Sequence, residues 1–150
     1  MIVYPTAKIN IGLNVLIKRQ DGYHDISSVF YPVNELYDIL EIIPSDDFSF
    51  SSTGIDIPGN GNICKKAFEL LKADFDIANV KIHLHKLIPI GAGLGGGSSD
   101  GAFTLKVLNK LFELNISNKR LEEYALQLGA DCPFFIDNTP KYVCGIGEKM

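Results

Sequence analysis

The 150-residue chain has few cysteines, no run of basic residues and no long apolar segment. Its three cysteines, Cys64, Cys132 and Cys144, show no C-x-x-C spacing, which indicates a reducing, cytoplasmic setting where they pack as small apolar side chains. The formal net charge is −4, and without a basic run the chain offers no track for a nucleic-acid backbone. No stretch approaches the roughly 20 apolar residues of a membrane-spanning helix, so the expected partners include neither nucleic acid nor a membrane.

The first 24 residues also lack the pattern of a secretion signal. They carry Lys8 early and have neither an uninterrupted apolar stretch nor a small-residue cleavage site, so we expect them to belong to the mature fold.

Hydrophobic residues make up 46% of the chain and charged residues 21%, which is the balance of a soluble globular protein. A chain of this length fits one domain, and it contains no internal repeat.

Alternation of apolar and polar residues is the clearest local pattern. It places Lys8 and Asn10 on the polar face of a half-buried strand, and an Asp-Gly pair then predicts a hairpin turn. Asp131 is expected to cap a helical turn that starts at Pro133. His83 and His85 have no further metal ligand nearby in the sequence, so no metal site is predicted for them. The patterns together predict an α+β fold with strands over 7–16, 24–33, 36–44, 46–52, 80–86 and 141–150 and helices over 62–75, 98–114 and 118–129.

Five glycines crowd into residues 91–97, between an alternating strand and an amphipathic helix. Gly91, Gly93 and Gly96 satisfy G-x-G-x-x-G, which alone is a weak signal for a phosphate-binding turn. No lysine follows the glycines, which excludes a Walker P-loop. A dinucleotide fold is disfavoured because its strands are buried on both faces, whereas the strand here alternates. A flexible linker is disfavoured by the patterned elements on both sides, so we expect a different kind of phosphate loop.

Three segments resemble the GHMP kinase superfamily, in that family's order. They are "AKINIGLNVLIKRQDGYH" at 7–24, "PIGAGLGGGSS" at 89–99 and "LGADCPFF" at 128–135. The resemblance is strongest to members that phosphorylate a cytidine diphosphate-linked small molecule. It implies the fold of the GHMP kinase N-terminal domain, which is similar to ribosomal protein S5 domain 2. That fold has a mixed, mostly antiparallel sheet with helices packed on one side.

The resemblance also assigns roles to residues of this chain. Lys8 and Asp131 would be the catalytic pair, with the aspartate accepting or orienting the substrate hydroxyl and the lysine stabilising the charge that develops on its oxygen. ATP would be a substrate, and Mg²⁺ would arrive with its phosphates. The expected substrate-binding residues are Asn10, Tyr23 and His24. The expected ATP-binding residues are Asn62, Lys86, Pro89, Ile90, Gly91, Ala92, Gly93, Leu94, Gly95, Gly96, Gly97, Ser98 and Ser99; residues 89–99 are called the glycine loop below.

Members of the family are longer and carry a second, C-terminal domain. We therefore expect residues 1–150 to form the N-terminal ATP-binding domain, without the family's C-terminal domain, and to show little or no turnover alone. Two alternatives stay open. One is a different small-molecule kinase of the superfamily, of the homoserine or phosphomevalonate type. The other is a nucleotide-binding module without turnover. For Asn62 a separate alternative stays open, because this residue could equally be a plain helix cap.

Overall fold

The computed structural model describes residues 1–18, 24–59 and 62–145. Five strands precede the first helix and three helices follow one another after β6, a grouping typical of α+β folds, and the expected fold class is confirmed. The strands are β1 Ile2–Val3, β2 Thr6–Lys18, β3 His24–Tyr37, β4 Ile39–Pro44, β5 Ser49–Gly54, β6 Val80–Lys86 and β7 Lys141–Gly145. The helices are α1 Ile63–Asp74, α2 Gly96–Leu111, α3 Asn118–Leu128 and α4 Phe134–Asp137.

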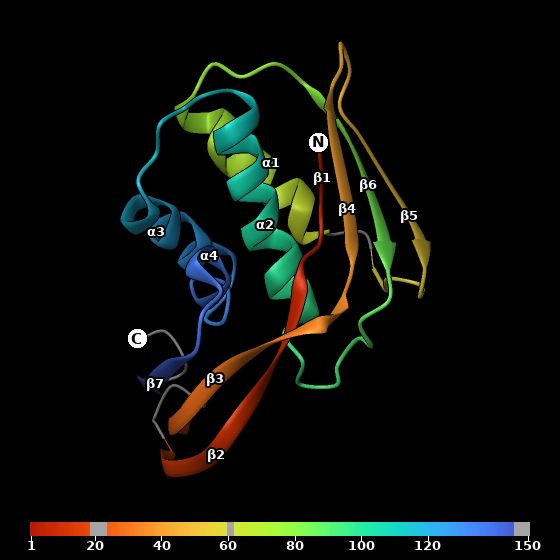
Figure 1. The fold of residues 1–150 in the computed structure, drawn as a ribbon. Helices are drawn as coiled ribbons and strands as arrows, with labels where there is room; N and C mark the ends of the chain where they lie inside the picture. Colours follow the sequence, from red (N-terminus) through yellow and green to blue (C-terminus); the bar gives the residue numbers. More distant parts are fainter. Residues whose placement is uncertain (19–23, 60–61, 146–150) are drawn as a thin grey trace.

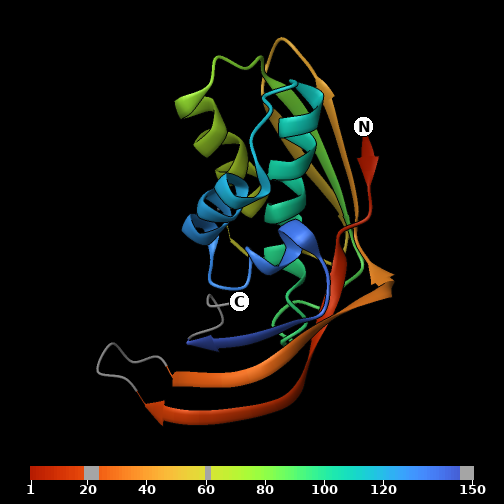
Figure 2. The same cartoon turned by 60° about the vertical axis from the view of Figure 1, so that its left-hand side comes forward.

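The strands form two sheets that meet near the start of α2 (Figure 1). A four-stranded sheet has the order β1-β4-β6-β5, and a three-stranded antiparallel sheet has the order β2-β3-β7. β5 runs parallel to β6, so the sheet is mixed and mostly antiparallel, as the family resemblance implies. Its direction follows from the connection, because α1 carries the chain across the sheet between β5 and β6. The long β2–β3 hairpin extends away from the helices (Figure 2).

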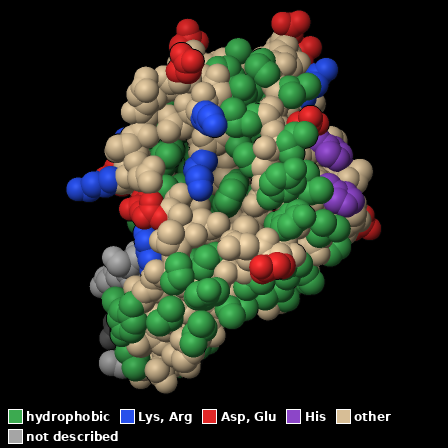
Figure 3. All heavy atoms as spheres, viewed as in Figure 1, with side chains coloured by type: hydrophobic (Ala, Val, Ile, Leu, Met, Phe, Trp, Pro, Cys, Tyr) green, Lys and Arg blue, Asp and Glu red, His purple; other side chains and the backbone are tan. Residues whose placement is uncertain are grey.

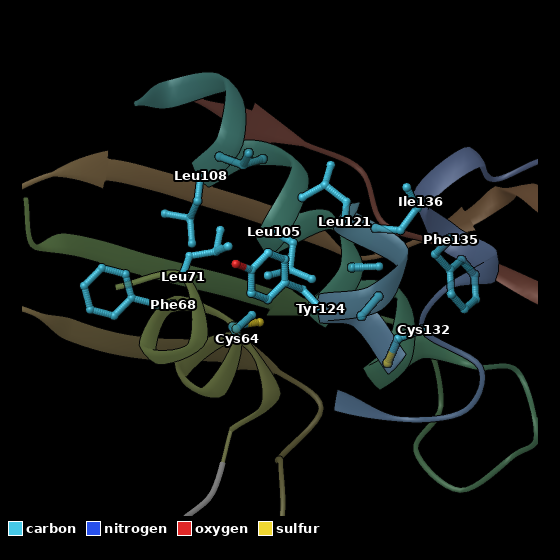
Figure 4. Close-up of a cluster of buried hydrophobic side chains, with 14 of the residues drawn as sticks. Cys64, Phe68, Leu71, Leu105, Leu108, Leu121, Tyr124, Cys132, Phe135 and Ile136 are labelled. Atoms are coloured by element: carbon cyan, nitrogen blue, oxygen red, sulfur yellow. The ribbon is translucent and has the colours of Figure 1, made fainter. Parts of the chain in front are cut away.

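The helices cover one face of the four-stranded sheet (Figure 1). α1 and α2 supply the apolar stripes that their 3.6-residue spacing predicts, with Ala67 and Leu71 buried on α1 and Leu105 and Leu108 buried on α2. In Figure 4 Leu71, Leu105 and Leu108 converge with side chains of α3 and α4, including Tyr124. The core therefore lies between the helices and the sheet. The glycine loop, which leads into the start of α2, lines a cavity instead.

The alternation in β2 correctly indicated a strand, but burial is confined to its first residues: Ala7 on the apolar face and Lys8 on the polar face are both buried, whereas Asn14 and Val15 are exposed. Lys8 is 3% exposed, whereas Ile9 and Ile11 on the opposite face are 41% and 50% exposed. Lys8 lies across from Pro32 and Asn10 from Phe30 in β3, so the polar residues share their face with core side chains. Within the described residues the outer face of this sheet stays open, and Figure 3 shows apolar side chains over the region where β2 and β3 lie.

Several expected boundaries shift for local reasons. α2 begins at Gly96 instead of Ser98, because Gly95 takes a left-handed conformation, with φ of +69°, and ends the loop as the N-cap. β3 continues past Val33 to Tyr37 through an irregular register with β2. The expected turn at 21–22 and the last five residues lie outside the described part of the chain. His83 and His85 hydrogen-bond Ser51 and Thr53 across the β5–β6 pair, at the right of Figure 3.

Two of the three cysteines pack in the core as expected, and all three are free thiols. Among the described residues, no helix combines the length and the apolar character that a bilayer crossing requires.

Candidate active site

A cavity of about 410 Å³ lies where the glycine loop joins α2. Its wall is formed by residues 89–98 of the loop together with Ile57, Asn62, Ile63, Lys86 and Asp100. The volume lies within the usual range for small-molecule sites. A methyl group on Gly91, Gly93 or Gly97 would meet no atom within 4 Å, so the backbone at these positions faces open space that a ligand can enter. The geometry is that of a concave backbone cradle.

The first turn of α2 supplies hydrogen-bond donors to this cradle. The N–H of Ser99 donates to the carbonyl of Gly95 at 2.9 Å, which is the first bond of the helix. The preceding N–H groups of Gly96, Gly97 and Ser98 have no intrahelical acceptor, and the positive end of the helix dipole lies with them. Such a terminus binds phosphate groups. Gly95 is the N-cap of α2, and no side-chain hydrogen bond caps this helix.

Lys8 and Asp131 meet beside this cradle, although 123 residues separate them. The Lys8 Nζ lies 3.4 Å from Asp131 Oδ2 and donates to Asn10 Oδ1 at 2.7 Å. It also lies 4.2 Å from the centre of the Phe30 ring, a cation–π contact that helps to offset its burial. The Asp131 side chain is 30% exposed, so the carboxylate remains open to a substrate while the ammonium is held below it.

Asp131 does not cap the helical turn that follows it. α4 begins after Pro133, which is its N-cap, and no side-chain oxygen bonds to the free N–H groups there. The expected capping role of Asp131 is therefore wrong. The residue lies in the turn between α3 and α4, and its described ion-pair partner is Lys8.

Lys8 also connects the pair to the glycine loop. Its backbone N–H donates to the Leu94 carbonyl at 2.8 Å, so β2 and the loop are joined directly. Gly95 approaches closely: a Cβ there would lie 3.0 Å from Lys8 Cγ and 2.9 Å from Phe135 Cζ. Only glycine combines this contact with the left-handed backbone found at this position. The arrangement places a lysine–carboxylate pair at the side of an anion cradle.

The remaining predicted residues fall into three groups. Asn62 caps α1, its Oδ1 accepting from the Cys64 N–H at 2.7 Å, which confirms the helix-cap interpretation. It also lines the cavity, and its nucleotide-binding role stays a prediction. Ser99 is fully buried and does not line the cavity, unlike the rest of the predicted loop. Tyr23 lies outside the described residues, and for His24 only the backbone position at the start of β3 is described.

Two acidic residues near the cavity, Asp38 and Asp100, were not among the predicted site residues. The Lys86 Nζ donates to Asp38 Oδ2 at 2.5 Å and to Asp100 Oδ2 at 2.8 Å. Asp100 lines the cavity, and burial raises the pKa of its carboxyl group to about 8. Its position directly after the glycine loop was the available signal. Asp38 gave none, because 48 residues separate it from Lys86.

Comparisons with known proteins agree with this geometry. The family model described as the GHMP kinases N terminal domain matches residues 62–138. A relative from Cytophaga hutchinsonii, named 4-diphosphocytidyl-2-C-methyl-D-erythritol kinase, is 54% identical over 93% of this chain and 52% of its own length. A relative of the same name from Bacteroides thetaiotaomicron is 52% identical over 99% of this chain and 56% of its own length.

A solved structure gives the same result for the fold. The crystal structure of a 4-(cytidine 5'-diphospho)-2C-methyl-D-erythritol kinase superposes with a TM-score of 0.84 at 38% identity, covering 99% of this chain and 53% of that protein. The chain thus spans about half the length of the curated relatives that it matches. The family model covers more than half of its residues, including the cradle and Asp131. The chain belongs to the GHMP kinase family and contains that family's N-terminal domain.

Proposed function

We propose that this protein transfers the γ-phosphoryl group of ATP to the 2-hydroxyl of 4-diphosphocytidyl-2-C-methyl-D-erythritol, in the non-mevalonate route to isoprenoid precursors. The observation that carries the proposal is the position of Lys8, which bonds the glycine loop through its backbone and Asp131 through its side chain. One residue thereby links a phosphate cradle to a carboxylate. The names of the most similar relatives support the substrate.

Phosphoryl transfer requires mainly positioning and charge stabilisation. The loop N–H groups and the N-terminus of α2 would hold the β- and γ-phosphates of ATP. Asp131 would accept a hydrogen bond from the substrate hydroxyl and take its proton as the oxygen attacks. Lys8, at 3.4 Å from that carboxylate, would stabilise the negative charge that develops on the attacking oxygen. Because Lys8 is 3% exposed, little solvent screens its charge.

The nucleotide and the substrate would enter from different sides of Lys8. Asn62 would present its amide to the nucleotide, while the Lys86 side chain would act indirectly, because two carboxylates already bind its ammonium group. Asn10 would position the substrate hydroxyl through the same Lys8 that it contacts. Tyr23 and His24 would contact the cytidine ring, by stacking and by hydrogen bonds to the base edge. Mg²⁺ would be brought by the ATP phosphates and is assigned no protein ligand.

The test is an assay of ADP release by the product of the complete reading frame to which these residues belong. The proposal expects turnover with the cytidine substrate and none with homoserine or phosphomevalonate. The reverse result would replace the proposed substrate by that of another GHMP kinase. ATP binding without turnover on any of the three would show a nucleotide-binding module. Residues 1–150 assayed alone should give little or no turnover.

A further inference from the structure

Three charged side chains are buried together beneath the glycine loop. Asp38, Lys86 and Asp100 are each at most 3% exposed, and they come from the β3–β4 junction, the end of β6 and the second turn of α2. Lys86 Nζ donates to one oxygen of each carboxylate, at 2.5 Å and 2.8 Å. Two carboxylates thus share one ammonium group. If both were ionised, the cluster would carry a net charge of −1 in a place with little water.

The cluster holds both ends of the glycine loop. Asp38 Oδ1 accepts hydrogen bonds from the N–H groups of Leu87 and Ile88, at 2.6 Å and 2.8 Å, just before the loop begins. Asp100 lies in α2, just after the loop ends. Lys86 Nζ lies 2.9 Å from the point where a Cβ on Gly96 would stand. A change in the charge of this cluster therefore acts on the backbone that forms the cradle.

The two carboxylates are not equally satisfied. Asp38 uses both oxygens, accepting one bond from Lys86 and two from backbone N–H groups. Asp100 uses only Oδ2, and within the described part of the chain its buried Oδ1 has no hydrogen-bond partner. Hydrogen bonds to the charged form favour ionisation, so a single proton shared by the cluster belongs on Asp100. Burial raises the pKa of Asp100 to about 8, which agrees with this assignment.

The neighbouring titratable groups leave Asp100 as the group that changes charge near neutral pH. Burial works to lower the pKa of Lys86, but the charges and hydrogen bonds of Asp100 and Asp38 outweigh it and hold that pKa above its ordinary value. Cys64, from α1, faces the cluster, and burial raises the pKa of its thiol so that it remains neutral. Asp100 also lines the cavity, where its carboxyl group would meet the field of any bound phosphate.

We propose that Asp38, Lys86 and Asp100 form a proton-coupled clamp on the glycine loop, in which Asp100 takes up a proton when a nucleoside triphosphate enters the cavity. This inference rests on the proposed function, because it requires the cradle to bind phosphates. Negative charge from the phosphates disfavours the ionised form of Asp100. By linkage, the protonated clamp binds the nucleotide more tightly, and nucleotide affinity falls as the pH rises above the pKa of Asp100.

The test is isothermal titration calorimetry of MgATP into the complete gene product at pH 8.5, in two buffers with different heats of ionisation. At that pH the terminal phosphate of the nucleotide carries no proton of its own. If binding raises the pKa of Asp100 by about one unit, about half a proton is taken up per nucleotide. Asp100→Asn should bind MgATP without proton uptake, because the amide is neutral and its oxygen can still accept from Lys86.

Asp131→Asn is the matched control. It removes a carboxylate near the same cavity, but one that is 30% exposed, and it should keep the wild-type proton uptake. Binding without proton uptake in the wild-type protein would overturn the clamp while leaving the nucleotide site in place. Uptake that persists in Asp100→Asn would overturn the assignment to Asp100. Absence of any binding would overturn the nucleotide site itself, and the clamp with it.

A second measurement needs no variant. In protein labelled with ¹³C at the aspartate carboxyl carbons, one resonance should titrate near pH 8 in the absence of nucleotide. That resonance should remain in its protonated position at pH 8.5 once MgATP is added. A spectrum in which every described aspartate has ionised below about pH 6 would exclude the protonated state on which the clamp depends.

Discussion

Replacing Gly95 by alanine tests whether the contact between the glycine loop and Lys8 is as close as the structure shows. Two costs are expected. The first is conformational, because Gly95 has a φ of +69° and an L-residue in this region loses about 1–2 kcal/mol. The second is steric, because the new Cβ would lie 2.9 Å from Phe135 Cζ and 3.0 Å from Lys8 Cγ. Overpacking of this kind costs about 1–3 kcal/mol, so the free energy of unfolding should fall by about 2–5 kcal/mol in total.

Gly93→Ala separates the two costs. Gly93 has a φ of +75°, so the backbone penalty is the same, but a Cβ there meets nothing within 4 Å. This variant should lose only about 1–2 kcal/mol. The assay is urea unfolding of both variants and the wild-type protein, followed by circular dichroism, with the m-values checked for constancy. Equal losses in the two variants, within about 0.5 kcal/mol, would refute the close approach of the loop to Lys8 and Phe135.

Three further predictions concern α2 and the catalytic pair. Gly97→Ala should be neutral or stabilise the fold by up to about 1 kcal/mol, whereas Gly96→Ala should destabilise it, because only the second Cβ would approach Ile88 and Lys86 within 3 Å; thermal unfolding distinguishes them. Burial raises the pKa of Asp100 to about 8, so the folded protein is expected to keep a proton there that the unfolded chain releases, and stability should fall as the pH rises from 5 to 8, by up to about 1.4 kcal/mol per pH unit. Asp100→Asn should flatten that slope in denaturant titrations at several pH values. Asp131→Asn in the complete gene product should abolish phosphoryl transfer and spare ATP binding, and surviving turnover would remove Asp131 from its catalytic role.

The elements of the fold were predictable because their patterns are local. The period of α2 and the alternation of β6 each depend on neighbours within a few residues, and both elements formed where expected. The division of strands between two sheets, and the parallel pairing of β5 with β6, depend on the path of the chain in space. No window of sequence contains that path. The same reason hid Asp38, whose partner Lys86 lies 48 residues away.

The glycine loop was predictable for a different reason. Five glycines in seven residues have no use in an ordinary strand or helix, so their presence indicated special backbone geometry. In the structure, four of the loop's glycines serve three different purposes. Gly95 permits a close contact and a left-handed turn, and Gly96 approaches Lys86, while Gly91 and Gly93 leave space for a ligand. Sequence alone indicated the cradle but did not show which glycine served which purpose.

The prediction that failed most informatively concerns which residues of β2 are buried. A period of two defines two faces but does not say which one is covered, and at Lys8 the polar face is covered while Ile9 and Ile11 on the opposite face stay exposed. Within these 150 residues, turning β2 over would bury Ile9 and Ile11, each worth about 1.5–3 kcal/mol, and release Lys8 to water. The observed register forgoes that gain. Specific contacts must therefore fix it, and they are the bond from the Lys8 N–H to Leu94 and the partners of its ammonium group, Asn10 Oδ1 and the Asp131 carboxylate. The buried position of Lys8 thereby sets its ammonium group against the Asp131 carboxylate, while its backbone is bonded to the glycine loop.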